Sequence, residues 1–175
     1  MSDATPPVSI RPFRAADREA VRDLFIRVNR SIAPPSLKEK FEIYIARSLA
    51  EEIDRVADYY GERNGGFWVA ESAGAIVGMF GLEPDGPRAM ELRRMYVAPD
   101  ARRRGIARMM LGYAEDECRR RNRPTMDLST SELQADALSF YRSAGYRLVR
   151  EEVALSASNK TLGGGIRRYY FTKLL

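Results

Sequence analysis

Residues 91–111 read E-L-R-R-M-Y-V-A-P-D-A-R-R-R-G-I-A-R-M-M-L, and this stretch combines a strand, a turn and the start of a long helix. The strand is expected to end at Val97, a Pro-Asp turn follows at 99–100, and the three arginines and the glycine at 102–105 are expected to open the helix. A helix N-terminus has unpaired N–H groups and a partial positive charge, so it binds phosphate groups. The three arginines at 102–104 add positive charge, and Gly105 has no Cβ that would keep a ligand away from the backbone. The stretch therefore predicts a pocket for a ligand that carries a diphosphate.

The strand in this stretch has an irregular apolar spacing. Leu92, Met95 and Val97 are separated by three residues and then by two, whereas a regular strand repeats every two residues. One extra residue near 93–94 restores the alternation, which predicts a β-bulge. A bulge turns backbone groups away from the neighbouring strand, so the residues at 95–97 can pair with an extended ligand that lies beside them.

Hydrophobic periodicity along the chain predicts the element order β-α-α-β-β-β-α-β-α-β-β. The second helix is expected to run without a break from Ser36 to about Tyr60. We expect residues 1–7 to be a disordered tail and residues 8–175 to form one α/β (α+β) domain with a mixed, mostly antiparallel sheet.

The composition excludes several kinds of catalytic site. The 175 residues include no histidine and a single cysteine, Cys118, which is expected to be a partly buried residue of the long helix. Catalytic triads that use imidazole, histidine zinc sites and internal disulfides are therefore excluded. A general acid or base has to be Glu, Asp, Tyr, Lys or a chain terminus, and no metal site is expected.

The charge pattern suggests the kind of partner. The formal net charge is +5, which suits an anionic ligand, but no basic run is interleaved with stacking aromatic residues, so we expect no nucleic-acid binding. The most apolar segment, 66–82, is interrupted by polar residues and glycine, so no membrane partner is expected. Because no signal peptide or disulfide framework is visible, we expect a cytoplasmic protein, and a homodimer is left open.

Two motifs resemble the GNAT superfamily of acetyltransferases. The first is R-R-R-G-I-A at 102–107, directly after the V-x-P-x-x turn at 97–101, and the second is A-L-S-F-Y-R-S-A-G-Y at 137–146. The resemblance covers almost the full chain and implies a single GNAT-like domain with a seven-stranded sheet flanked by about four helices. It also implies direct transfer of the acetyl group from acetyl-CoA to a primary amine of a small molecule or peptide. Residues 45–81 are similar to the camello-type branch, which includes cysteine-conjugate and lysine acetyltransferases.

The resemblance implies a role for two candidate catalytic residues. Tyr141 would be the general acid that protonates the departing CoA thiolate, which a phenol can do because its basicity is comparable. Glu91 would be the base that accepts the proton of the amine, but a structural salt bridge with Arg93 or a neighbouring strand is an equal alternative. Weaker candidates for the base are Glu83, Glu71 and Asp127.

The resemblance also implies a set of cofactor-binding residues on the strand, the turn and the two following elements. Gln134 stands where many relatives have asparagine, and its longer amide can still reach the cofactor arm. The full set is Met95, Tyr96, Val97, Arg102, Arg103, Arg104, Gly105, Ile106, Ala107, Arg108, Ser129 and Gln134. The acceptor is expected to enter between the second helix and the Gly163–Gly165 loop, beside aromatic residues that could line the mouth: Phe41, Tyr44, Tyr59 and Tyr60.

Two other functions stay open at the level of sequence. The chain could be a regulatory module that binds acyl-CoA without turnover, although binding alone does not need an acid at Tyr141. It could also be a transferase that uses a longer acyl-CoA, which the volume of the pocket at the bulge would decide.

Overall fold

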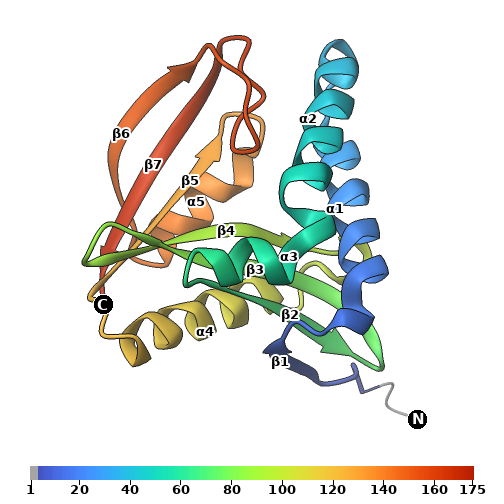
Figure 1. The fold of residues 1–175 in the computed structure, drawn as a ribbon, viewed down its shortest axis with the longest axis vertical. Helices are drawn as coiled ribbons and strands as arrows, with labels where there is room; N and C mark the ends of the chain where they lie inside the picture. Colours follow the sequence, from blue (N-terminus) through green and yellow to red (C-terminus); the bar gives the residue numbers. More distant parts are fainter. Residues whose placement is uncertain (1–3) are drawn as a thin grey trace.

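The computed structural model describes residues 4–175, which form one seven-stranded sheet with helices on both faces (Figure 1). The strands are β1 (Val8–Pro12), β2 (Gly66–Ser72), β3 (Ala75–Asp85), β4 (Ala89–Val97), β5 (Thr125–Ser131), β6 (Arg147–Ala154) and β7 (Ile166–Leu174). The α-helices are α1 (Arg18–Ile32), α2 (Lys38–Glu51), α3 (Val56–Glu62), α4 (Ile106–Arg120) and α5 (Ala135–Ser143). The strand order is β1-β2-β3-β4-β5-β7-β6, and every neighbouring pair is antiparallel except β4–β5. The α/β domain with a mixed, mostly antiparallel sheet is confirmed.

Two glycines of β3 show how closely helices cover both faces of the sheet. A Cβ at Gly78 would lie 2.9 Å from the Met110 sulfur on α4. A Cβ at Gly81 would lie 2.4 Å from the Tyr60 hydroxyl on α3. Figure 1 shows α4 on one side of the strands and α1 and α3 on the other. Small residues at these two positions therefore let the helices approach the sheet.

The sheet separates between β4 and β5. These parallel strands pair only from Ala89–Thr125 to Leu92–Leu128, although β4 continues to Val97 and β5 continues to Ser131. Beyond Leu92 the β5-facing edge of β4 has no strand partner within the described chain, and the two strand ends diverge. This separation creates the space in which the candidate site lies.

The bulge predicted in β4 is confirmed. Tyr96 is opposite Met79 and Arg93 is opposite Gly81, so two residues of β4 face one residue of β3. Arg94, within this bulge, has a φ of 54°, in the left-handed region that non-glycine residues rarely adopt. The bulge therefore contains local strain that the surrounding contacts have to stabilise.

The expectation of one unbroken helix from Ser36 to Tyr60 is wrong. The helix ends at Glu51, and α3 begins at Val56 after a short 3₁₀ turn. Glu52, at the break, has φ −140° and ψ −61°, and its fully buried side chain contacts two arginines of β4. Apolar periodicity continues through the break, so the pattern alone could not reveal that a charged residue turns inward there.

The long helix α4 buries the single cysteine. Cys118 is fully buried against the sheet, and burial raises the pKa of its thiol to about 12.

Residues 1–3 of the predicted tail lie outside the described residues, and the Pro6 carbonyl accepts hydrogen bonds from Ser72 and Arg104. No helix within residues 4–175 is long and apolar enough to span a bilayer.

Candidate active site

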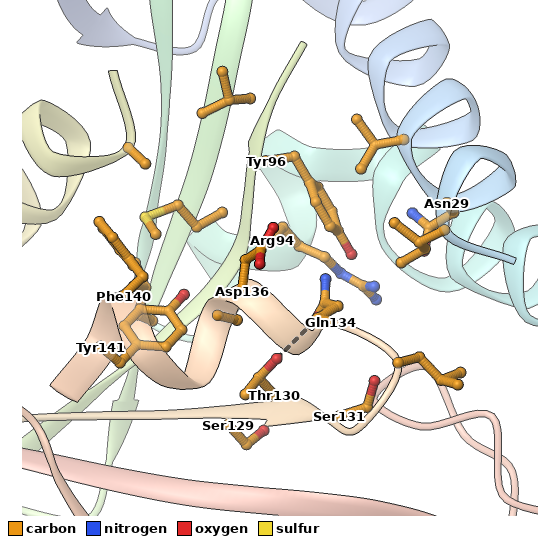
Figure 2. Close-up of a pocket in the computed structure, with 18 of the residues that line it drawn as sticks. Asn29, Arg94, Tyr96, Ser129, Thr130, Ser131, Gln134, Asp136, Phe140 and Tyr141 are labelled. Carbon is orange, nitrogen blue, oxygen red and sulfur yellow. Dashed lines mark hydrogen bonds between the residues drawn. The ribbon is translucent and has the colours of Figure 1, made fainter. Parts of the chain in front are cut away.

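A cleft of about 770 Å³ occupies the space between the diverging ends of β4 and β5. Its walls come from β4, the turn before α4, the end of β5, the start of α5, helices α1 and α2, and residues 160–162 of the β6–β7 loop. Figure 2 shows the Tyr96 and Arg94 side chains on one wall and Gln134 and Tyr141 on the opposite wall. The cleft therefore brings together segments that are more than a hundred residues apart in sequence.

The turn before α4 presents a continuous series of hydrogen-bond donors to this cleft. Within the described chain, the backbone N–H groups from Arg102 to Arg108 have no backbone or side-chain acceptor. Arg103 and Gly105 both have positive φ values, 62° and 73°, which turn successive N–H groups toward one side. A Cβ at Gly105 would meet no atom within 4 Å, so the space above this residue is open. Unpaired N–H groups, a helix N-terminus and exposed arginines fit a diphosphate.

Three of the expected cofactor-binding residues are placed differently from the others. The Arg104 side chain does not line the cleft and donates instead to Ser72 Oγ at 3.0 Å and to the Pro6 carbonyl at 2.8 Å. The Ile106 side chain is buried in the core, which leaves its backbone N–H as its contribution. Ser129 lines the cleft, but its hydroxyl accepts a hydrogen bond from Arg168 on β7 at 2.7 Å. Side-chain direction at these positions could not be inferred from the motif.

The edge of β4 and the loop after β5 form facing walls for an extended ligand. Met95, Tyr96 and Val97 all line the cleft, on the strand edge that β5 has left. Opposite them, the Thr130 hydroxyl donates to Gln134 Oε1 at 2.7 Å, which fixes the amide orientation (Figure 2). The Gln134 amide nitrogen is then available as a donor. The chemistry of these residues suits an extended ligand that carries amide groups.

Tyr141 lies at the base of the cleft on α5. Its side chain is buried among aromatic residues, and within residues 4–175 its hydroxyl has no hydrogen-bond partner. Burial, together with the nearby Tyr96 phenol, raises the pKa of Tyr141 well above that of a free tyrosine. The hydroxyl therefore remains protonated over the physiological pH range, as a proton donor requires.

Glu91 lines the cleft and forms an ion pair, but with a lysine of the β6–β7 loop and not with the expected Arg93 or a neighbouring strand. Lys160 Nζ lies 2.7 Å from Glu91 Oε2 and 3.2 Å from Glu83 Oε1. Burial lowers the pKa of Lys160, but the adjacent Glu91 outweighs burial and raises it overall. The salt-bridge alternative thus involves a residue 69 positions away, which no local sequence signal could identify.

The weaker candidates for the base do not line the cleft. Glu83 is buried and pairs with Arg93 at 3.2 Å. Glu71 lies at the other end of the sheet and pairs with Arg11, and Asp127 accepts a hydrogen bond from Thr172. Glu91 is therefore the better placed of the four carboxylates.

A buried cluster of charged residues packs against the bulge of β4. Glu52 Oε2 lies 2.7 Å from Arg94 Nη2 and 3.0 Å from Arg93 Nη2, and Tyr60 donates to Glu52 Oε1 at 2.6 Å. Arg94 also donates to the Tyr44 hydroxyl at 2.7 Å. Burial raises the pKa of Glu52, but the two arginines and Tyr60 outweigh burial and lower it, so the carboxylate is ionised. The cluster fixes the Arg94 side chain and with it the left-handed backbone at the bulge.

The aromatic residues expected at the acceptor mouth divide into two groups. Phe41 and Tyr44 line the cleft, whereas Tyr59 and Tyr60 belong to the buried cluster, where Tyr59 accepts a hydrogen bond from Arg93. The helix break at Glu52 explains the division, because it turns α3 away from the direction of α2.

A comparison with protein-family models gives a match over residues 33–146 to the acetyltransferase (GNAT) family. The matched region covers well over half of the chain and includes β4, the donor turn, α4 and Tyr141. The chain belongs to the GNAT acetyltransferase family. The matched region includes both motifs, at 102–107 and 137–146.

Curated relatives of this GNAT domain are N-acetyltransferases of vertebrates. N-acetyltransferase 8 of Rattus norvegicus is 32% identical over 114 residues, which are 62% of this chain and 51% of that protein. Probable N-acetyltransferase camello of Xenopus tropicalis is 30% identical over 120 residues, which are 67% of this chain and 55% of that protein. The chain thus matches about half the length of these relatives, and the similarity to the camello-type branch is confirmed.

Solved GNAT structures share the fold along nearly the full chain. A GNAT acetyltransferase from Staphylococcus aureus Mu50 has a TM-score of 0.72 at 23% identity and covers 94% of this chain and 98% of its own. The PaiA N-acetyltransferase of Thermoplasma acidophilum, solved with coenzyme A, has a TM-score of 0.74 at 16% identity and covers 97% of this chain and 99% of its own. These similarities show the fold of the GNAT domain described above.

Proposed function

We propose that this protein is an N-acetyltransferase that transfers the acetyl group of acetyl-CoA directly to a primary amine. The observation that carries the proposal is the combination of three features in one cleft. These are the free N–H series from Arg102 to Arg108, the unpaired edge of β4 at 95–97, and the protonated hydroxyl of Tyr141. A diphosphate, two amides and a departing thiolate require donors of these three kinds.

Different residues along the cleft bind different parts of acetyl-CoA. The N–H groups at the start of α4, with Arg102, Arg103 and Arg108, hold the diphosphate. The β4 edge and Gln134 orient the pantetheine arm so that the thioester lies between the bulge and Tyr141. Preorganised donors of this kind lower the barrier because they do not reorganise during the reaction.

Proton transfer at the thioester uses the two candidate catalytic residues. Glu91 accepts a proton from the acceptor ammonium, directly or through water, and the neutral amine attacks the carbonyl carbon. The C–N bond forms as the C–S bond breaks, and Tyr141 donates its proton to the departing sulfur. The proton that the attacking nitrogen still has to lose passes through water to the Tyr141 phenolate, which leaves a neutral amide and restores the acid. Direct attack needs no covalent intermediate on the protein.

The comparisons support this proposal through the printed names of the relatives. The curated relatives are named N-acetyltransferases, and two of the structural neighbours were solved with coenzyme A or acetyl-CoA bound. The acceptor proposed here remains a primary amine of a small molecule or peptide, since those names give no acceptor for this chain.

The proposal is tested by calorimetric titration with acetyl-CoA, desulfo-CoA and AMP, followed by a screen of primary amines for CoA release. We expect saturable binding that requires diphosphate and pantetheine together, and release of CoA with at least one class of amine. Absence of acetyl-CoA binding would refute the cofactor site. Binding of acetyl-CoA without release of CoA for any amine would favour the regulatory-module alternative. Faster release of CoA from a longer acyl-CoA would show that the longer acyl-CoA is the donor.

A further inference from the structure

The acceptor side of the cleft already contains a primary amine. The 175-residue chain has only four lysines, which are Lys38, Lys40, Lys160 and Lys173. Lys160 lines the cleft, and its Nζ donates to Glu91 Oε2 at 2.7 Å. The amine is thus in hydrogen-bond contact with the carboxylate that is proposed to deprotonate an acceptor.

The β6–β7 loop holds this lysine close to the bulge. Arg94 Nη2, from the bulge itself, donates to the carbonyl of Asn159, the residue before Lys160, at 2.5 Å. The loop is closed locally by a hydrogen bond from Ser158 N to the Thr161 carbonyl at 2.8 Å. The Lys160 backbone is therefore tied to the strand edge along which the pantetheine arm is proposed to lie.

The Lys160 side chain also has room to move. Its exposed fraction is 47%, and three consecutive glycines with positive φ follow at 163–165. A long, half-exposed ammonium on such a loop can exchange its ion-pair partners for a position nearer the thioester.

We infer that Lys160 is an acetylation site of this protein, modified by its own active site when no acceptor is present. This inference rests on the proposed function. In the reaction, Glu91 takes a proton from the Lys160 ammonium, and the neutral Nζ attacks the thioester carbon of acetyl-CoA. A C–N bond forms, the C–S bond breaks, and the thiolate leaves with the proton of Tyr141. The second proton of the attacking nitrogen passes through water to the Tyr141 phenolate, which leaves a neutral amide and restores the acid. The products are Nε-acetyl-Lys160 and CoA.

The modification changes the charge of the acceptor subsite. Acetylation removes the positive charge of Lys160, so both of its ion pairs, to Glu91 and to Glu83, are lost. Glu91 then faces the cleft without a resident cation. A cationic acceptor would bind more readily to the modified protein, because it no longer competes with an attached ammonium.

The test is to incubate the full chain with isotope-labelled acetyl-CoA in the absence of any amine and to map the label by peptide mass spectrometry. Lys173 is an internal control, because its Nζ lies 2.8 Å from Glu115 in an ion pair of the same kind outside the cleft. Proximity to a bound thioester should label Lys160 at least about tenfold faster than Lys173. Since the ion pair keeps Lys160 protonated, the rate should rise with pH. The K160R variant should lose this label, and K173R should keep it.

Each outcome of the labelling experiment either supports or overturns the inference. A labelling half-time that does not depend on protein concentration supports transfer within one molecule, and a half-time that shortens with concentration overturns it. Equal labelling of all four lysines, or equal labelling in urea, would show ordinary chemical acetylation and overturn the inference. No label at Lys160 while added amines still release CoA would refute this inference alone. Failure of acetyl-CoA binding would refute the proposed function instead.

Discussion

At the scale of single residues, the Tyr141 hydroxyl is notable for making no hydrogen bond in the described chain although its ring is buried. Replacing Tyr141 with Phe removes only this oxygen, so we expect little change in stability or in acetyl-CoA affinity. Loss of a general acid should lower kcat by about a hundredfold. Steady-state kinetics and calorimetry on Y141F, with Y113F on α4 as a matched control outside the cleft, separate the two effects. Unchanged kcat in Y141F would remove Tyr141 from the mechanism.

The pKa of Tyr141 makes a second, independent prediction for the same residue. Because burial raises this pKa above that of free tyrosine, the acid form persists beyond pH values near 10. The alkaline limb of kcat should therefore show no loss of activity from Tyr141 at pH values where a free phenol has ionised. A pH profile of kcat that falls with an apparent pKa below that of free tyrosine would contradict the assignment.

Two roles are open for the Glu91 carboxylate, which is either a catalytic base or one half of a structural ion pair. If Glu91 accepts the proton of the acceptor, E91Q should lower kcat/KM by about a hundredfold at neutral pH and flatten its acidic limb. If Glu91 only holds Lys160, the K160M variant should imitate E91Q, because either change breaks the same ion pair. Rate profiles of the two variants distinguish these roles: a base requires E91Q to lose activity that K160M retains.

At the scale of elements, the turn before α4 can be tested with two glycines of similar backbone geometry. Gly105 and Gly86 have φ values of 73° and 68°, and a Cβ at either would meet nothing within 4 Å. Alanine at either position should cost about 1 kcal/mol from backbone strain. Only G105A places a methyl group over the donor series, so acetyl-CoA binding should weaken strongly in G105A and stay unchanged in G86A. Equal affinities in calorimetry would rule out the proposed diphosphate position.

Local sequence patterns predicted the elements of this site better than the contacts between them. The bulge followed from the spacing of Leu92, Met95 and Val97, because alternation along a strand is a local property. The helix break at Glu52 and the Lys160–Glu91 pair depend on residues about 40 and 69 positions apart. The direction of the Arg104 side chain could not be predicted for the same reason, since its partner Ser72 lies on β2. Long-range pairing of charged side chains leaves no periodic trace in one sequence.

At the scale of the whole molecule, the Glu52 cluster connects the helical layer to the site. Replacing Glu52 with Gln leaves two buried arginines without their counter-charge, so E52Q should lower the free energy of unfolding by about 3–5 kcal/mol. As a control, E62Q removes an exposed pair with Arg55 and should cost less than about 1 kcal/mol. Urea unfolding of both variants measures the difference, and similar losses would contradict the role of the cluster.

The same cluster predicts how stability depends on pH. The pKa of Glu52 is lower in the folded chain than in the unfolded one, so its contribution is fully present above the unfolded value of about 4.3. That contribution is lost as the pH falls through the folded pKa. Wild-type stability should therefore decline more steeply below pH 4.3 than that of E52Q. Parallel curves for the two proteins would show that Glu52 is not ionised in the fold.

The burial of Cys118 has a practical consequence for measuring the reaction. The product CoA is a thiol, and the protein's single cysteine is fully enclosed with its pKa raised to about 12. A disulfide reagent added to the native enzyme should therefore register released CoA and almost nothing from the protein itself. On denaturation the same reagent should register one equivalent per chain. The protein therefore contributes almost no signal during turnover, and denaturation afterwards gives a count of the chains present.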